Sequence, residues 1–222
     1  MKAKVECWLN TLRVEGKPDE WESKELLKQI GLSVPRGLRI LPEEELSANE
    51  LEFPLVLKVC DPEIMHKTDR GGVYLNVSKP EFQASLIKLR KKFPGSPVLA
   101  ESMCRVEGPE FILGALVDPV FGPAVMAGAG GIFTELYEDV SFRLCPCPED
   151  EAVRMLKELK ISPVLRGYRG SRLELESLAE SVSLLSKLFE AFDGRLNQVD
   201  INPMVYCGSG WTALDCVLIL NQ

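Results

Sequence analysis

The chain has 222 residues, of which 45% are hydrophobic and 27% are charged, a composition typical of a globular enzyme. This balance excludes a disordered protein or a coiled coil as a description of the whole chain. The net charge is −7 and the basic cluster is confined to residues 88–92, which disfavours a nucleic-acid-binding protein.

The predicted elements alternate between helices and strands without a regular order. Residues 1–19 are weakly patterned and are expected to form an N-terminal extension. Hydrophobic periodicity then predicts, in chain order, a helix over 20–30, strands over 37–41, 54–60 and 73–77, a helix over 80–93, strands over 97–103, 110–117, 123–127 and 141–144, helices over 149–160 and 173–192, and strands over 197–206 and 211–220 around a turn at 207–210. This mixed order indicates an α+β fold rather than a doubly wound parallel sheet.

The apolar segment 111–133 carries a single charge, Asp118, and is long enough for a membrane helix. It also contains five glycines and two prolines, which break helices. We therefore expect buried strands joined by glycine-rich turns, and no membrane span.

The seven cysteines are an odd number, and no signal peptide is recognisable at the N-terminus. This pattern predicts free thiols in the reducing cytoplasm. Cys145 and Cys147 form the one close pair, and with a single histidine in the chain they are expected to be buried thiols rather than zinc ligands.

Two common nucleotide-binding motifs, GxxxxGK[ST] and GxGxxG, do not occur. The GxSxG motif, which surrounds the nucleophilic serine of many hydrolases, does not occur either.

The residues that could carry chemistry form three clusters. The first is Lys58 in a predicted strand, followed by a loop with His66, Lys67, Gly71 and Gly72. A lysine in a buried strand needs an anion or a route to water, and glycines with cations suit a phosphate. The alternative is a lysine at a strand edge beside a plain hairpin.

His66 is the chain's only histidine, and an imidazole nitrogen is a good acceptor for a phosphoryl group near neutral pH. The second cluster is a glycine-rich segment and the charged residues after it, which are expected to form a phosphate-binding loop, namely Gly130, Gly131, Glu135 and Arg143. Its alternative interpretation is a tight sheet turn with a solvated glutamate.

The third cluster is Asp200, Asn202 and Asp215. Alternation places Asp200 and Asn202 on one face of a strand, and a hairpin turn at 207–210 would bring Asp215 near them. Carboxylate and amide oxygens are the ligands of Mg²⁺ held with phosphates, whereas the alternative is a set of charges at a hairpin edge. Together the three clusters indicate phosphoryl transfer.

The sequence resembles the ATP-grasp (β) subunit of ADP-forming acyl-CoA (acetyl-CoA) synthetases, and more distantly the succinyl-CoA synthetase β chain. The resemblance extends over about residues 20–220. It is carried by the segments 58–73, 108–110, 121–123, 128–135, 139–143, 165–170 and 200–203.

The resemblance implies an ATP-grasp fold over residues 20–222, with two subdomains clasping a nucleotide, and the reaction acyl-CoA + ADP + phosphate ⇌ acid + CoA + ATP. It also implies a CoA-binding α subunit that carries a phosphohistidine, and an α₂β₂ heterotetramer. The chain alone should be inactive, because the CoA-binding domain is absent.

The resemblance also assigns roles to residues. His66 matches a second phosphohistidine carrier. The nucleotide-binding positions, for ATP or ADP, are Lys58, Lys67, Gly71, Gly72, Glu101, Met103 and Glu110. Asp200, Asn202 and Asp215 match the Mg²⁺ site. The alternatives are another ATP-grasp carboxylate ligase, which needs no phosphohistidine, and a nucleotide-sensing module without turnover.

Overall fold

The computed structural model describes residues 1–14, 16–44, 51–64, 66–131, 138–168, 173–208 and 210–221. The chain divides into two compact units. Unit 1 comprises Met1–Pro18, Glu22–Val34 and Arg105–Gln222, and unit 2 comprises Asp19–Trp21 and Pro35–Cys104. Each unit has its own sheet and its own hydrophobic core.

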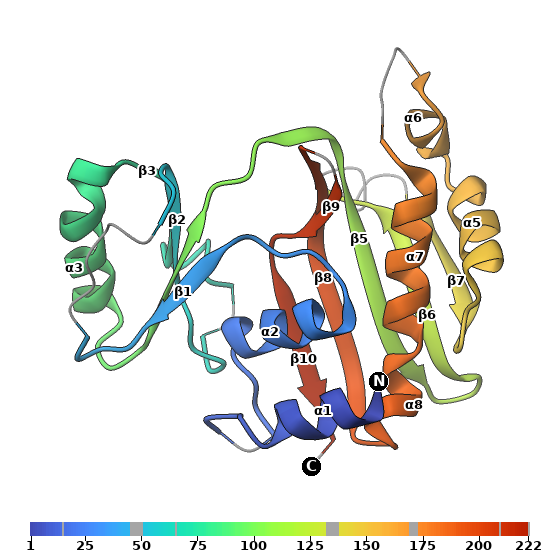
Figure 1. Cartoon of the computed structure of the whole chain (residues 1–222), viewed down its shortest axis with the longest axis horizontal. Helices are drawn as coiled ribbons and strands as arrows, with labels where there is room; N and C mark the ends of the chain where they lie inside the picture. The colour runs from blue at the N-terminus through green and yellow to red at the C-terminus, as the bar shows by residue number, and fades with distance from the viewer. Residues whose placement is uncertain are drawn as a thin grey trace. The chain divides into compact units, whose positions relative to one another are not determined.

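In the described part of unit 2, four antiparallel strands form a sheet in the order β1-β4-β2-β3. Their bounds are β1 (Gly37–Ile40), β2 (Leu55–Val59), β3 (Val73–Val77) and β4 (Val98–Ser102). Helix α3 (Phe82–Lys92) follows a short 3₁₀ helix, η2 (Lys79–Glu81), and covers one face of this sheet (Figure 1). Phe82, Leu86 and Leu89 are buried at helical spacing, so they supply the helix's contribution to the core, as the periodicity predicts.

Unit 1 contains a larger antiparallel sheet in the order β10-β8-β5-β6-β7, with β9 pairing with β8 as well. The strands are β5 (Val106–Asp118), β6 (Gly122–Ala129), β7 (Val140–Leu144), β8 (Leu196–Cys207), β9 (Gly210–Ala213) and β10 (Cys216–Leu220). The expected strand 211–220 is therefore two strands, separated at residues 214–215, that both pair with β8.

The helices of unit 1 are α1 (Lys2–Leu9), α2 (Glu20–Ile30), whose first residues belong to unit 2, α5 (Glu149–Glu158), α6 (Ser162–Leu165), α7 (Leu175–Ser186) and α8 (Leu188–Phe192). Helices α5 and α7 lie beside each other against the sheet (Figure 1). The expected helix 173–192 is interrupted at Lys187, which is bonded through its backbone to Leu184 and separates α7 from α8.

Met1–Pro18 belong to unit 1, and Lys2–Leu9 within this segment form α1. Val5 and Trp8 are buried in the core, and the Trp8 ring packs edge-on against Phe192 with 5.9 Å between ring centroids. The Trp8 Nε1 also donates a 2.6 Å hydrogen bond to the Glu22 carbonyl. The N-terminal segment thus contributes to packing, although two core residues in one short helix leave only a weak sequence pattern.

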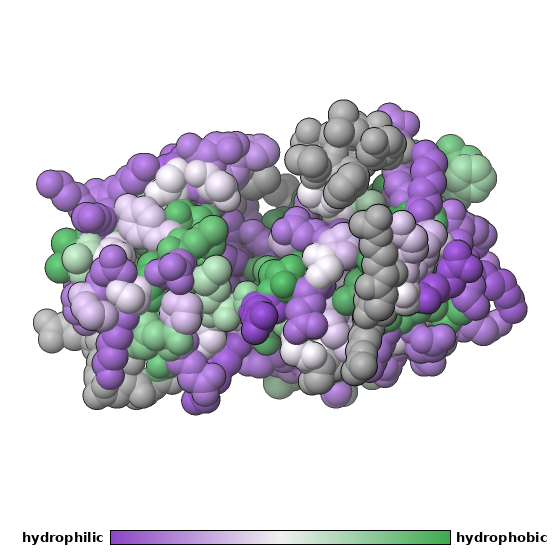
Figure 2. All heavy atoms as spheres, turned by 90° about the horizontal axis from the view of Figure 1, so that it is seen from above, coloured by the Kyte–Doolittle hydropathy of each residue, from purple (hydrophilic) through white to green (hydrophobic). Residues whose placement is uncertain are grey.

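The apolar segment that begins at residue 111 forms buried antiparallel strands, β5 and β6, as expected from its glycines and prolines. Within the described residues, no helix has the length and apolar character needed to cross a membrane. On the face shown in Figure 2, hydrophobic side chains form separate patches among hydrophilic ones.

Candidate functional site

One face of the sheet of unit 2 carries charged side chains, while the core occupies the other face. Glu101 on β4 lies opposite Val56 on β2 and Gly37 on β1. Because side chains alternate between faces along a strand, Lys58 and Arg39 share the face of Glu101. Three strands thus contribute charged groups to the same surface of the sheet.

Lys58 is buried and its ammonium is held by two buried carboxylates. The Nζ atom lies 2.6 Å from Glu20 Oε1 and 3.2 Å from Glu101 Oε2. A buried ammonium is costly unless it is paired, and these two carboxylates supply the pairing. The requirement that this lysine meet an anion is confirmed, and the alternative of a lysine extending from a strand edge into water is wrong.

The second oxygen of Glu20 binds a second lysine. Lys67 Nζ donates to Glu20 Oε2, and both side chains are largely shielded from solvent. Glu20 therefore joins strand β2, through Lys58, to the loop that contains Lys67. Asp19, the preceding residue, forms a 2.8 Å ion pair with Arg39 on β1, so residues 19–20 are fixed to unit 2 by charge.

Residues 66–72, which we call the histidine loop, fold back on themselves through backbone hydrogen bonds. Arg70 N donates to His66 O at 3.2 Å, Gly71 N to Thr68 O at 2.8 Å and Gly72 N to Lys67 O at 2.7 Å. His66 has a φ of 51° and its side chain is exposed. The imidazole is thus accessible on a compact turn.

The local structure explains why residues 71 and 72 of the histidine loop are glycines. Gly71 has a φ of 59°, in the left-handed region that favours glycine. A Cβ on Gly72 would lie 2.7 Å from Val59 Cγ1, so the loop packs closely on β2 at this point. The sequence assigned both glycines to a phosphate, and their geometry is explained by packing and turn formation within the chain.

Glu101 and Met103 lie at the end of β4, just before the chain leaves unit 2 after Cys104. The Glu101 carboxylate faces Lys58, whereas the Met103 side chain is exposed and its backbone N donates to Pro54 O at 2.9 Å. Their expected contact with adenine remains a prediction.

In unit 1, the structure brings Asp200 and Asp215 close together. Val199 and Ile201 are buried in the core, so Asp200 and Asn202 lie on the opposite face of β8, as the alternation predicts. Asp215 lies in the bend between β9 and β10.

The electrostatics of this pair follow from burial and like charge. Desolvation raises the pKa of the Asp200 carboxyl, and the nearby Asp215 carboxylate raises it further. A divalent cation relieves such repulsion, and carboxylate and amide oxygens are the ligands that Mg²⁺ prefers. Asp200, Asn202 and Asp215 therefore fit a magnesium site with few protein ligands. In the part of the chain that the structure describes, no group of three or more His, Cys, Asp or Glu side chains is arranged to hold a metal by itself.

The glycine-rich segment packs against Glu110, another predicted site residue. The Gly130 N donates to the Glu110 carbonyl at 2.7 Å, and a Cβ on Gly130 would lie 2.8 Å from the Glu110 carbonyl carbon. Gly131 has a φ of 63° and lies near the Glu110 carboxylate. The predicted residue Glu135 is outside the described residues.

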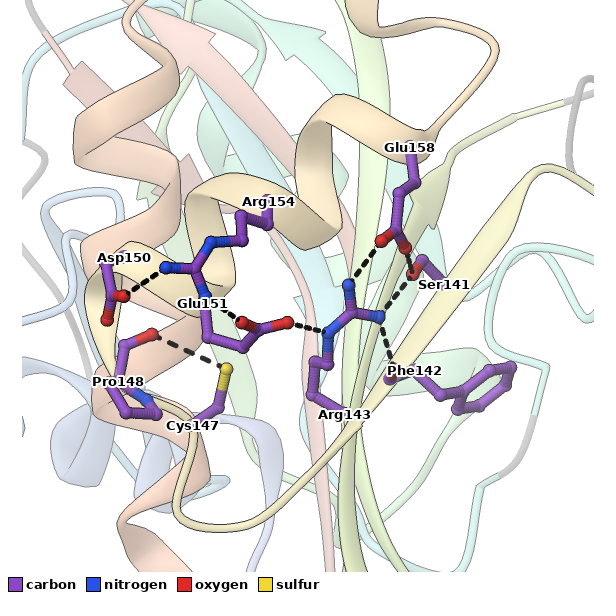
Figure 3. A network of polar contacts seen from close by, with 9 residues as sticks. All are labelled: Ser141, Phe142, Arg143, Cys147, Pro148, Asp150, Glu151, Arg154 and Glu158. Atoms are coloured by element: carbon purple, nitrogen blue, oxygen red, sulfur yellow. Dashed lines mark hydrogen bonds and ion pairs between the residues drawn. The ribbon is translucent and has the colours of Figure 1, made fainter.

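Arg143 is held by acidic residues of α5, as Figure 3 shows. Its Nε and Nη2 atoms lie 2.5 Å from Glu151 and Glu158, respectively. The hydrogen bond to Glu158 raises the pKa of the guanidinium, and the bond to Glu151 adds to the effect. These contacts join strand β7 to helix α5, and the expected role of Arg143 beside a phosphate remains a prediction.

Cys145 and Cys147 are both free thiols. Burial raises the pKa of Cys145 to about 12, so this sulfur is protonated at neutral pH and a poor zinc ligand. Cys147 is buried, and its backbone N donates to Ser186 Oγ at 2.9 Å. Both observations agree with the expectation of buried thiols, with Cys145 only partly covered.

The chain matches a known family. The ATP-grasp domain matches residues 13–220, so the chain belongs to the ATP-grasp family. A similar protein is the β subunit of acetate–CoA ligase [ADP-forming] I from Pyrococcus furiosus, which is 34% identical, with 98% of each chain covered. The chain is thus a member of the ADP-forming acetate–CoA ligase β-subunit family.

Two further comparisons agree. The 4-hydroxybutyrate–CoA ligase [ADP-forming] of Nitrosopumilus maritimus is 33% identical over 96% of this chain, which spans only 32% of that larger enzyme. A structure of the dinucleotide-forming acetyl-coenzyme A synthetase 1 of Ca. Korarchaeum cryptofilum superimposes with a TM-score of 0.79 at 32% identity, covering 93% of this chain and 94% of that one. That structure contains coenzyme A and Mg-AMPPCP, with its phosphohistidine segment pointing towards the nucleotide-binding site.

Glu20 is the residue of this region that sequence reasoning missed. It was recognised only as the start of a helix, where an acidic residue is favoured by the helix dipole. The available signal is indirect: a buried lysine predicts a buried acid, and Asp19 and Glu20 lie at the start of an amphipathic helix. The pairing partner itself is 38 residues away from Lys58, beyond the reach of local patterns.

Proposed function

We propose that this chain is the nucleotide-binding β subunit of an ADP-forming acid–CoA ligase and works with a separate CoA-binding α subunit. The reaction is acyl-CoA + ADP + phosphate ⇌ acid + CoA + ATP. The observation that carries the proposal is the end-to-end similarity to a β subunit of this type, which covers 98% of both chains. The larger fused relative, of which this chain spans 32%, supports a partner that supplies the remaining functions.

Within this function, we assign His66 as a phosphoryl carrier. The exposed imidazole suits a group that must meet a mobile donor and a nucleotide in turn. In the direction of ATP consumption, a ring nitrogen of His66 forms a bond to the γ-phosphorus while the bond from that phosphorus to the β–γ bridging oxygen breaks, and ADP leaves. In the reverse direction the phosphoryl group passes from His66 to ADP. The donor to His66 is a phosphohistidine of the α subunit, in an α₂β₂ assembly.

The remaining predicted residues take supporting roles. Lys58 contacts the phosphates, and Glu101 and Met103 contact the adenine. Asp200, Asn202 and Asp215 hold Mg²⁺, which neutralises phosphate charge when bound. Asp200 ionises to bind the metal, and Asp215 lies close enough to raise its pKa.

A labelling experiment tests the carrier role. The purified chain is incubated with Mg²⁺ and ATP labelled in the γ-phosphate, beside His66→Ala and, as a neighbouring control, Thr68→Ala. Because His66 is the only histidine in the chain, acid-labile, base-stable label that is identified as phosphohistidine has one possible position. We expect such label on the wild type and on Thr68→Ala, and none on His66→Ala.

Two outcomes would overturn the assignment. Label that persists in His66→Ala would refute the carrier role. A chain that binds Mg-ATP but takes no label, with or without an α subunit, would favour a carboxylate ligase without a phosphohistidine or a nucleotide-sensing module.

A further inference from the structure

Glu20 occupies a central position in the charged surface of unit 2. It is the first residue of α2, and its side chain is only 3% exposed. One carboxylate oxygen binds the Lys58 ammonium at 2.6 Å and the other binds the Lys67 ammonium. One buried carboxylate therefore joins two lysines from different elements.

The histidine loop depends on this contact for its position. Its C-terminal end is fixed to β2, because Val59 N donates to Gly72 O at 2.8 Å and Gly72 packs against the Val59 side chain. Its N-terminal half contains His66 and Lys67, and the Lys67 side chain links that half to Glu20. The backbone bonds at Lys67 and His66 keep the turn compact, so movement of Lys67 carries His66 with it.

The chemistry requires a carboxylate at residue 20. Two ammonium groups need two acceptor oxygens, and charge-assisted bonds are the strong ones. A glutamine offers one acceptor oxygen, and its NH₂ group would face an ammonium, donor against donor. Aspartate is one methylene shorter and cannot reach both lysines from the same backbone position. Lys58 keeps Glu101 as a partner when Glu20 is changed, because the two ion pairs are separate.

We infer that Glu20 is a positioning residue for phosphoryl transfer: by binding Lys67 and Lys58 together it holds the histidine loop, and hence His66, in the geometry that accepts the phosphoryl group. The inference rests on the proposed carrier role of His66. It also assigns Lys67 to the loop rather than to the nucleotide. A displacement of about 1 Å at a reacting group can lower a rate by about 100-fold, so a loose loop has a large kinetic effect.

The test compares Glu20→Gln, Lys67→Met and the double variant in the full chain. The matched control is Glu25→Gln, the same change one helical turn later, where the carboxylate pairs with Lys28 on the surface. Three quantities are measured: the rate at which acid-labile label from γ-labelled ATP appears on His66, the Kd for Mg-ATP by calorimetry, and the Tm.

We expect Glu20→Gln and Lys67→Met each to lower the labelling rate by about 10- to 100-fold. The Kd for Mg-ATP of Lys67→Met, which leaves Lys58 paired with both carboxylates, should stay within about threefold of wild type. Because both changes break the same contact, the double variant should label about as slowly as the slower single variant. Glu25→Gln should label at the wild-type rate.

The outcomes distinguish a failure of the carrier role of His66 from a failure of the positioning role of Glu20. A wild-type chain that takes no label, with or without an α subunit, overturns the carrier role itself. A labelled wild type with Glu20→Gln at the same rate overturns the positioning role and leaves the carrier role standing. Multiplicative losses in the double variant, or a rate and an affinity that fall together in Lys67→Met, also overturn it, because they indicate independent or merely structural effects. If Glu20→Gln does not fold, the labelling rate of Lys67→Met tests the positioning role. This variant removes the contact between the histidine loop and Glu20 and leaves Lys58 paired with both carboxylates.

Discussion

The close approach of Gly130 to Glu110 predicts that Gly130→Ala destabilises unit 1. A Cβ at residue 130 would lie 2.8 Å from the carbonyl carbon of Glu110 and 2.9 Å from its carbonyl oxygen. These atoms belong to the backbone, so no side-chain rotation relieves the clash. The Gly130 N–H also donates to that same carbonyl at 2.7 Å, which resists separation of the two segments.

The magnitude follows from two opposing effects. Overpacking of this kind costs about 1–3 kcal/mol. Replacement of glycine by alanine restricts the unfolded chain and returns about 0.4–1 kcal/mol. We therefore expect a net loss of about 1–2 kcal/mol in the free energy of unfolding.

Gly210→Ala provides a matched control, because a Cβ at residue 210 would meet nothing within 4 Å. This variant should be as stable as the wild type or slightly more stable. Urea unfolding is followed by circular dichroism and by tryptophan fluorescence. Trp211 reports on the region, since its ring packs edge-on against Phe111, the neighbour of Glu110, at 5.2 Å. A Gly130→Ala midpoint equal to or above that of Gly210→Ala would refute the reasoning.

Two further predictions concern charged groups of unit 1. The folded pKa of Asp200 is raised, so the folded chain binds more protons than the unfolded chain between the two pKa values, and its stability falls as the pH rises through that window. Asp200→Asn should therefore raise the Tm of the ligand-free chain at neutral pH, raise it less at acidic pH, and weaken Mg²⁺-dependent nucleotide binding; an unchanged Tm difference across pH would contradict this. Asp118→Asn is the opposite control, because backbone N–H groups of Phe121 and Val120 lower the pKa of Asp118. Arg143→Met should lower the Tm more at low than at high ionic strength, since salt screens partly exposed ion pairs. A loss of nucleotide affinity in Arg143→Met with no change in Tm would instead support the phosphate-binding role of Arg143 that the sequence predicts.

Much of the fold follows from local patterns. Strand β3 and helix α2 have the bounds that the sequence predicts, because apolar spacing defines both and Gly31 ends the helix. The placement of Asp200 and Asn202 on one face follows from simple alternation about the buried Val199 and Ile201. These features depend on residues a few positions apart.

The roles of charged residues are less accessible to such reasoning. Arg143 and Lys58 are recognisable as functional candidates, but their partners are chosen by the tertiary fold. Glu151 and Glu158 reach Arg143 only because α5 packs beside β7, and Glu20 reaches Lys58 across 38 positions. A sequence pattern records that a buried charge needs a partner and does not record whether that partner is a ligand or another side chain.

The division of the chain into units has a consequence for its synthesis. The segments of unit 2 lie between residues 19 and 104, so its described strands and helices are synthesised before Arg105 is added. Unit 1 needs both early and late segments: Trp8 packs on Phe192, and β5 pairs with β8. During translation, unit 2 can complete its fold first, while α1 and most of α2 wait for the last third of the polypeptide. The side chains of Val5 and Trp8 therefore stay exposed on the nascent chain for most of elongation. During this period they form an apolar segment of the kind that chaperones bind.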